Sequence, residues 1–283
     1  SLHDALPISL ALRCAPVQVN WLGYAGTIGH PRLADYLLGD PMVTPLHHGP
    51  YYTETIAHLP GCYLPADSTL ALTAPPTRRE AGLPATGFVY CSFNNSYKFN
   101  PLVFDLWCRL LRESDDSCLW LSQPAESSAD RLRNEAQARG VDPGRLVFAP
   151  RVASRVAHLS RLQLADLALD PFPYNSHSTG IDVLWAGVPM VALLGDTFPG
   201  RVGASVLRAA GLDELIAGSV DEYYRLAMDL FGDPQRLQEL RRKLAENKHG
   251  CPLFDMPRFV SSLEDVYFRM WDNHLQGTRM PLV

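Results

Sequence analysis

Short apolar runs alternate with longer amphipathic stretches along the chain from residue 77 onward. The apolar runs do not alternate with polar residues, which is typical of parallel strands buried on both faces. They predict strands at residues 88–93, 118–121, 146–149, 167–169, 190–194 and 214–217. The amphipathic stretches predict helices at residues 101–112, 129–139, 154–164, 201–210, 221–231, 234–247 and 257–276. This alternation predicts an α/β fold, a doubly wound parallel sheet with helices on both faces.

The pattern before residue 77 is less regular. Residues 17–24 predict a strand that runs into a glycine-rich loop, and further short elements are expected as a helix at 32–38, a strand at 42–44 and a helix at 55–59. A stretch dense in proline and threonine then reaches Pro75 and Pro76. We therefore place a domain boundary there, with one unit at residues 10–76 and a second at 77–283.

The first nine residues, 1–9, read SLHDALPIS and have neither the charged start nor the apolar run of a signal peptide. They resemble a translated sequencing-adapter junction. We expect them to be non-native and leave them out of the fold prediction.

Composition narrows the class of protein. The 283 residues carry 25 basic and 30 acidic side chains, a net charge of −5, so no basic surface predicts nucleic acid as a partner. The longest nearly uncharged apolar run, residues 183–195, is too short to span a bilayer, so no membrane partner is expected. The six cysteines show no CxxC spacing, which favours buried free thiols and a cytoplasmic location.

Residues 173–197 form the most informative stretch: a polar loop, a short helix and a buried strand. Ser178 or Thr179 is expected to cap the helix, beside His177, and Gly180 would let a ligand approach the backbone. Unpaired N–H groups and the helix dipole suit this helix start to a phosphate or diphosphate. Asp182, in the first turn, can accept hydrogen bonds from a sugar hydroxyl. The alternative is a capped helix with a solvated histidine.

Two further polar segments follow strands of the same predicted sheet. Lys98 comes after the strand at 88–93 and can neutralise a phosphate of a departing diphosphate, although a solvated loop lysine is the alternative. Arg155, His158 and Arg161 recur at a spacing of three on one helix face, where the imidazole can stack on a base and the arginines can hold ribose or base carbonyls. The alternative is an ordinary basic helix face. Because ligands of parallel sheets bind beyond the carboxyl ends of the strands, all three segments together favour a nucleotide diphosphate.

The sequence contains no Ser/His/Asp or Cys/His order that would predict a hydrolase, and it gives little support for a metal site. His47 and His48 lack a nearby third ligand, so we interpret them as loop histidines. Asp115 and Asp116 are expected in a turn at the opposite edge of the sheet. No metal site is therefore predicted.

The block HSTGIDVLWAGVPMV at residues 177–191 closely resembles the O-GlcNAc transferase family. The segments at 15–24, 91–98, 163–166, 252–254, 263–264 and 270–271 resemble it too, and the likeness covers nearly everything from about Cys14 to the end. The family implies a GT-B fold with two Rossmann-like halves, and the donor bound mainly by the C-terminal half. Residues 10–76 would then be the end of the N-terminal half.

The resemblance also implies roles for individual residues. Lys98 resembles the lysine that binds the diphosphate, and His177, Ser178 and Thr179 resemble the donor-phosphate motif. Asp182 resembles the ribose-binding carboxylate. Around the base, His158 resembles the histidine packed on uracil and Arg161 the nearby arginine, while Arg155 stands where the family usually has lysine. Asn95 replaces the usual glutamine, and Leu22 and Gly23 match the loop beside the sugar, next to Ala25 in place of the family's proline.

The family's activity implies an inverting, metal-independent transferase that moves GlcNAc from UDP-GlcNAc to Ser/Thr hydroxyls of a protein acceptor, with no cofactor. The family's tetratricopeptide repeats and most of its N-terminal half have no counterpart here. The fragment is therefore expected to be inactive by itself, with apolar edges exposed on a truncated sheet. Two alternatives stay open: a nucleotide-sugar-binding module without transfer, and a transferase that uses another UDP-sugar.

Overall fold

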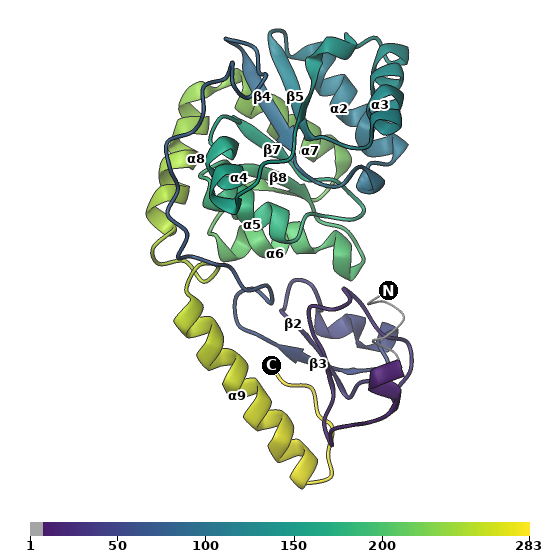
Figure 1. Ribbon diagram of the computed structural model, residues 1–283. Coiled ribbons are helices and arrows are strands. Elements are labelled where there is room, and N and C mark those ends of the chain that lie inside the picture. Colours follow the sequence, from purple (N-terminus) through teal and green to yellow (C-terminus); the bar gives the residue numbers. More distant parts are fainter. Residues whose placement is uncertain (1–7) are drawn as a thin grey trace.

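The computed structural model describes residues 8–283, which form a large and a small lobe (Figure 1). The large lobe is built on a six-stranded sheet. Its strands are β4 (Phe88–Ser92), β5 (Ser117–Ser122), β6 (Leu146–Ala149), β7 (Leu167–Leu169), β8 (Met190–Leu193) and β9 (Ile216–Ala217). All six strands predicted from residue 88 onward are present, although the first part of the last one is a 3₁₀ turn, Asp213–Leu215.

The sheet of the large lobe has the order β6-β5-β4-β7-β8-β9, and each neighbouring pair is parallel. Counted from β4, this is the 3-2-1-4-5-6 order of a doubly wound dinucleotide-binding sheet. The predicted α/β fold is therefore confirmed. Its helices are α2 (Pro101–Glu113), α3 (Glu126–Ala138), α4 (Arg155–Leu162), α5 (Ser178–Trp185), α6 (Val202–Ala209), α7 (Val220–Gly232) and α8 (Pro234–Asn247). The helices α2 and α7 pack together, and α5 packs between α4 and α6.

Helix α2 shows how the sequence sets an element of this lobe. Asn100 caps its start by accepting a hydrogen bond from the Val103 N–H at 2.9 Å, and Pro101 occupies the first position. Trp107 and Leu110 lie on its buried face, and burial of each such side chain stabilises the fold by about 2–3 kcal/mol. The Asn100 Nδ2 also donates to the Phe172 carbonyl at 2.6 Å, which ties the helix to the segment after β7.

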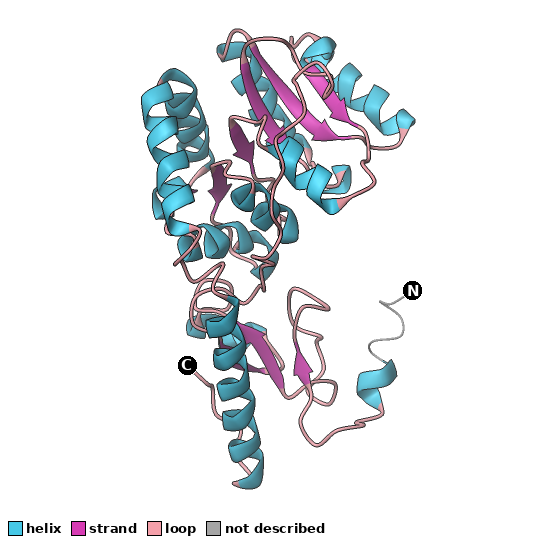
Figure 2. Cartoon of the chain, turned by 60° about the vertical axis from the view of Figure 1, so that its left-hand side comes forward, coloured by secondary structure: helices cyan, strands magenta, loops and turns pink. Residues whose placement is uncertain are grey.

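The small lobe contains a three-stranded parallel sheet of β1 (Val19–Asn20), β2 (Tyr36–Gly39) and β3 (Thr55–His58), in that order. Its core includes two residues from the far end of the chain, Val266 and Met270 of α9 (Met256–Leu275). Figure 2 shows α9 running along this lobe. The chain then returns to β3, where Leu282 donates its N–H to the Ile56 carbonyl at 3.1 Å.

Three predictions for the small lobe are wrong. The expected helix at 32–38 is a turn followed by β2, the expected strand at 42–44 is a turn, and the expected helix at 55–59 is β3. All four residues of β2 are buried, so its sequence has no alternation to reveal a strand. The covering surface comes from α9, more than two hundred residues later in the chain. The pattern of apolar and polar residues within a short segment cannot predict a contact with a helix so far away in the chain.

The edge strand of the small sheet, β1, lies beside α9, and the exposure of apolar edges stays a prediction. Val17 and Val19 line a cavity of about 280 Å³ with Tyr267, Met270 and Trp271 of α9. Elsewhere, the six cysteines are free thiols, with Cys14 exposed and the other five buried. None of the helices described between residues 8 and 283 is long and apolar enough to cross a membrane. The domain boundary after residue 76 stays a prediction, as does the non-native origin of residues 1–9, of which 1–7 lie outside the described residues.

Candidate functional site

The large sheet has its crossover point between β4 and β7. From β4 the chain adds β5 and β6 towards one edge of the sheet, and it then crosses over to add β7, β8 and β9 towards the other edge. Ligands of doubly wound folds bind at such a point, beyond the carboxyl ends of the two central strands. The loop after β4 carries Asn94 and Lys98, and the loop after β7 carries Asp170, Asn175 and His177. The topology therefore brings segments about eighty residues apart to one edge of the sheet.

Lys98 joins these two loops. Its ammonium donates to the Asn175 carbonyl at 2.8 Å and to Asn94 Oδ1 at 3.1 Å, and lies 4.4 Å from the centre of the Tyr174 ring. Burial lowers the pKa of Lys98 to about 8, while the negative charge of Asp170 opposes that shift. Lys98 is therefore largely cationic at neutral pH and is held at the centre of the crossover point. An ammonium so placed can stabilise a diphosphate.

His177 lies next to Lys98 at the start of α5. Its ring stacks on Tyr174, with 5.3 Å between ring centres and 18° between planes. Burial, and secondarily the charge of Lys98, lowers the pKa of His177 to about 4, so the imidazole is neutral at pH 7. Its Nε2 is buried and has no hydrogen-bond partner among residues 8–283. A buried ring nitrogen without a partner is a candidate ligand contact.

The helix start differs from the prediction in two details. The N-cap residue is His177, without a side-chain capping bond, and Ser178 is the first residue of α5 rather than its cap. In the described part of the chain, the N–H groups of Ser178 and Thr179 find no backbone acceptor. Gly180 faces the interior: a Cβ there would meet Met190 at 3.3 Å and Ser176 at 3.4 Å. This glycine serves packing rather than approach of a ligand.

The side chains of α4 border a cavity of about 380 Å³. It is lined by Ser122, Gln123, Ala149, Arg151, Val152, Ala153, Ser154, Arg155, His158 and Arg161. Arg161 is buried and contacts both the Pro150 carbonyl at 2.5 Å and His158 Nδ1 at 3.0 Å. Burial, with the charges of Arg161 and Arg155, lowers the pKa of His158 to about 4. The cavity thus presents a neutral imidazole fixed by a guanidinium, which suits a planar uncharged base.

Asp182 lies in α5, and its partner Arg155 lines this cavity. Its Oδ1 accepts from Arg155 at 3.1 Å, and the side chain is 18% exposed. Burial raises the pKa of Asp182, and the Arg155 guanidinium opposes that shift. The structure therefore brings Asp182 and Arg155 together, and both were predicted as possible contacts of the ribose.

In the small lobe, the loop after β1 is the segment that faces the crossover point of the large sheet. Leu22 and Gly23 line a cavity of about 320 Å³, whose other wall includes Tyr174 and His177 of the large lobe. Leu22 has φ 63°, a left-handed conformation that non-glycine residues seldom adopt and that clusters at functional sites. The predicted sugar-side loop and the predicted phosphate motif thus border one cavity.

Asn95 and the histidine pair stand apart from this arrangement. Asn95 is exposed, and its side chain accepts from the Tyr97 N–H within its own loop at 3.3 Å. His47 and His48 lie in the 3₁₀ turn Leu46–Tyr51 of the small lobe, and residues 8–283 contain no group of three His, Cys, Asp or Glu that could hold a metal ion. Asp115 and Asp116 form a turn before β5, as predicted.

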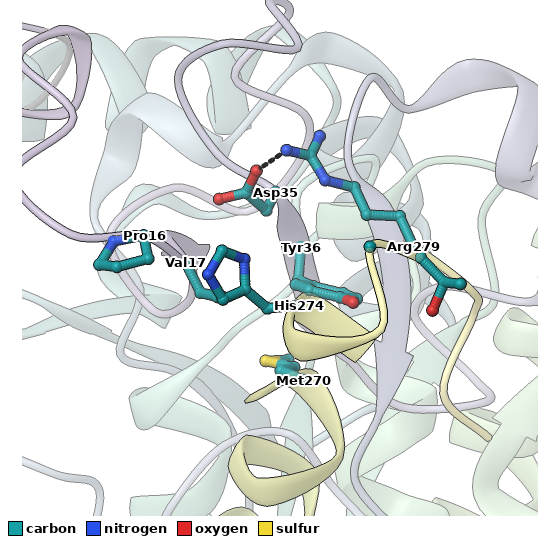
Figure 3. Close-up of a pocket in the computed structure, with 9 residues that line it drawn as sticks. Pro16, Val17, Asp35, Tyr36, Met270, His274 and Arg279 are labelled. Atoms are coloured by element: carbon teal, nitrogen blue, oxygen red, sulfur yellow. Dashed lines mark ion pairs between the residues drawn. The ribbon is translucent and has the colours of Figure 1, made fainter. Parts of the chain in front are cut away.

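A further cavity of about 380 Å³ lies in the small lobe between β2 and α9 (Figure 3). Its carboxylate, Asp35, is 3% exposed and pairs with Arg13 at 3.0 Å and with Arg279. The Gln18 N–H also donates to it at 2.8 Å. Because its hydrogen-bonding capacity is taken up by the protein, we interpret this group as structural.

The sequence analysis missed three residues of the crossover point. Asn175 supplies the carbonyl that holds Lys98, Tyr174 lies against both Lys98 and His177, and Asp170 is the buried acid directly after β7. The position of Asp170 was the available signal, because a carboxylate that directly follows a buried strand lies at the ligand-binding edge.

Comparison with known proteins agrees with this geometry. The family model of Glycosyl transferase family 41 matches residues 7–73 and 66–263. SEC of Arabidopsis thaliana, named a probable UDP-N-acetylglucosamine–peptide N-acetylglucosaminyltransferase, is 38% identical over 274 residues, which cover 94% of this chain and 28% of SEC. The enzyme of that name from Caenorhabditis elegans is 35% identical over 206 residues, 73% of this chain and 18% of its own length. This chain therefore spans less than a third of these relatives.

Solved structures extend the comparison. A mutant of Thermobaculum terrenum O-GlcNAc transferase superposes with a TM-score of 0.85 and 34% identity, covering 95% of this chain and 51% of that one. Anabaena HepE in complex with UDP superposes with a TM-score of 0.59 at 15% identity, over 86% of this chain and 65% of its own, which shows likeness of fold alone. These neighbours have the GT-B fold, so the predicted fold class is confirmed. The extent of the family match and the shared identity show that this chain belongs to glycosyl transferase family 41.

Proposed function

We propose that this chain is the donor-binding part of an inverting, metal-independent glycosyltransferase that moves GlcNAc from UDP-GlcNAc to Ser/Thr hydroxyls of proteins. The observation that carries the proposal is Lys98, an ammonium held across the crossover point by the Asn175 carbonyl at 2.8 Å. The base cavity lies beyond β5 and β6, on one side of β4, and the cavity shared by the two lobes borders the loop after β7, on the other side of β4. That order matches base, diphosphate and sugar of a nucleotide sugar.

Different residues of the site would contact different parts of such a donor. His158 and Arg161 would hold the uracil, and Asp182, with Arg155, the ribose. Lys98, His177 and the N–H groups of Ser178 and Thr179 would bind the diphosphate, and Leu22 and Gly23 would lie beside the sugar. When the bond from the sugar to the diphosphate breaks, negative charge grows on the leaving phosphate, and Lys98 is placed to stabilise it. This gives metal-independent transfer its source of positive charge.

Transfer is proposed for the whole protein rather than for this chain. The matched regions cover only 28% of SEC, 18% of the Caenorhabditis elegans enzyme and 51% of the Thermobaculum terrenum structure. We expect the chain to bind the donor and to be inactive without the rest of the polypeptide. A protein acceptor and a cytoplasmic location stay predictions, and no cofactor is proposed.

Calorimetric titration of this chain with UDP and then UDP-GlcNAc tests the proposal. Saturable binding is expected, and Asp182→Ala should weaken it at least tenfold, since a hydrogen bond to a charged group contributes roughly 1.5–3 kcal/mol. Asp130→Ala, a carboxylate on the surface of α3 that is 63% exposed, should bind as the wild type does. A folded chain that binds neither ligand would contradict the donor-site proposal. Equal affinity for UDP-glucose would favour a transferase for another UDP-sugar.

A further inference from the structure

Asp170 is a buried carboxylate for which donor binding has no direct use. It lies directly after β7 and is 1% exposed. Its Oδ1 accepts from the Ser176 N–H at 2.6 Å and from the Ser176 hydroxyl. Its Oδ2 has no hydrogen-bond partner among residues 8–283. An ionised carboxylate buried in this way is unfavourable unless a nearby charge compensates it.

The compensating charge is Lys98. Burial raises the pKa of Asp170 to about 7, and the hydrogen bonds from Ser176 and the charge of Lys98 oppose that shift. The other titratable groups near this pair are neutral at pH 7. They are His177 and Tyr174 beside Lys98, Cys91 of β4, and Tyr223 of α7, whose hydroxyl donates to the Asp170 carbonyl at 3.0 Å. From α6 the carboxylate meets the uncharged Gly203. Asp170 and Lys98 are therefore coupled mainly to each other.

The carboxylate also fixes the peptide that holds Lys98. The Ser176 N–H bound by Asp170 belongs to the same peptide unit as the Asn175 carbonyl that accepts from Lys98. Asn175 itself is fully buried, donates to the Pro171 carbonyl at 2.9 Å and accepts from the Gly203 N–H at 3.2 Å. Lys98 thus donates to the peptide rather than to the carboxylate, so its charge is not cancelled by a direct ion pair.

We propose that Asp170 is a positioning residue of the donor site: it orients the peptide between Asn175 and Ser176 and supplies the negative charge that keeps Lys98 cationic and available to the diphosphate. The inference rests on the proposed function for the identity of the ligand. The contacts through which Asp170 and Lys98 hold the same peptide do not depend on that identity. A purely structural carboxylate would fix the loop without affecting the protonation of the lysine.

Titration of Lys98 tests the link without any nucleotide. The chain has only three lysines, Lys98, Lys243 and Lys248, so trace acetylation followed by mass spectrometry can report the pKa of each amine separately. In Asp170→Asn, which keeps an acceptor for Ser176, we expect the pKa of Lys98 to fall by about one unit, with Lys243 unchanged as an internal reference. An unchanged pKa of Lys98 in a folded variant would overturn the inference.

The matched control is Asp166→Asn, at the other end of β7. Asp166 accepts from the Val89 N–H at 2.8 Å and pairs with Arg241 at 3.5 Å and Arg78 at 3.6 Å. Asp166→Asn should therefore lower the melting temperature of the protein while leaving the pKa of Lys98 unchanged. If Asp170→Asn fails to fold, the wild-type protein still tests the link: coupling predicts that the titration of Lys98 is broader than a single-site curve, and a curve of single-site width would contradict it.

Binding of UDP then connects the link to the ligand. Above pH 7 the affinity of Asp170→Asn should fall several-fold below that of the wild type, because less of Lys98 is protonated. At pH 6 the two proteins should converge, because Asp170 is then neutral in the wild type as well. A pH-independent difference would refute the charge-based role. If UDP binds to neither protein, the donor-site proposal fails, while the lysine titration still decides the link.

Discussion

A single ammonium, Lys98, carries most of the proposed chemistry. In the full-length protein, Lys98→Ala should lower kcat by about 10²–10³ while donor affinity changes by less than about tenfold, because the charge that it stabilises grows in the transition state. Single-turnover kinetics with UDP-GlcNAc, together with titration of UDP, separate the two effects. Lys243→Ala, a lysine on the surface of α8 that is 43% exposed, is the control. Equal losses in turnover and affinity would refute a transition-state role.

His158 gives a pH-dependent prediction at the same scale. Its pKa is lowered to about 4 in the folded protein, so the unfolded chain binds a proton first as pH falls below 6.5. The stability from the neutral imidazole is therefore present above pH 6.5 and is lost as pH falls towards 4. His158→Phe, which keeps a stacking ring, should remove this dependence, on the order of 1–3 kcal/mol. Urea unfolding at pH 7 and pH 4.5 measures the free energy of unfolding of both proteins. If the loss of stability between the two pH values is the same in His158→Phe as in the wild type, the prediction is wrong.

Side-chain types and loop positions were enough to select Lys98, His158 and His177 as site residues, but not to say how they contact one another. Asp182 was expected free for a sugar and is paired with Arg155, and Asn95 turns into its own loop. Such pairings depend on rotamers and on neighbours far apart in the chain. The sequence shows which groups reach an edge of the sheet but not which partners occupy them.

Among the elements, α6 is constrained by the buried acid beneath its first turn. Alanine in place of a helical glycine normally stabilises by about 1 kcal/mol. At Gly203, however, a Cβ would lie 2.1 Å from Asp170 Oδ2 and 2.9 Å from the Ala192 Cβ. Gly203→Ala should therefore destabilise the protein by at least about 2 kcal/mol in urea unfolding. Gly232→Ala in α7, where nothing lies within 4 Å of a new Cβ, should be neutral or stabilising. Equal stability of the two variants would contradict the steric argument.

Element prediction succeeded where each element carries its own signals. The helix α8 was predicted at its observed bounds from its amphipathic pattern, and its start carries local signals as well: Asp233 caps it and Pro234 opens it. The strands β2 and β3 have neither caps nor alternation, and they are strands because they pair with each other and are covered by α9. Their structure is decided by packing at long range, which short windows of sequence do not contain.

At the scale of the whole molecule, the two lobes meet through both polar and aromatic contacts. Asp40 of the small lobe accepts from the Ser205 hydroxyl of α6 at 2.6 Å, and Arg201 donates to the Met42 carbonyl at 2.5 Å. The Tyr63 and Phe198 rings pack edge to face at 5.0 Å beside the shared cavity. The base cavity, by contrast, is lined by the large lobe alone. Nucleoside and sugar thus depend on different parts of the fold.

This division predicts what happens when the small lobe is loosened. Met270 of α9 is 1% exposed in the core of that lobe, and Met270→Ala should destabilise it by about 2–5 kcal/mol. Hydrogen exchange should then rise in β2 and β3 but not in β4 to β8. UDP should still bind, because its proposed contacts lie in the large lobe, while any advantage of UDP-GlcNAc over UDP should disappear with the wall formed by Leu22 and Gly23. Leu275→Ala, 67% exposed near the end of the same helix, should change neither. If Met270→Ala weakens UDP and UDP-GlcNAc equally, the two lobes act as one unit and the proposed division between nucleoside and sugar is wrong.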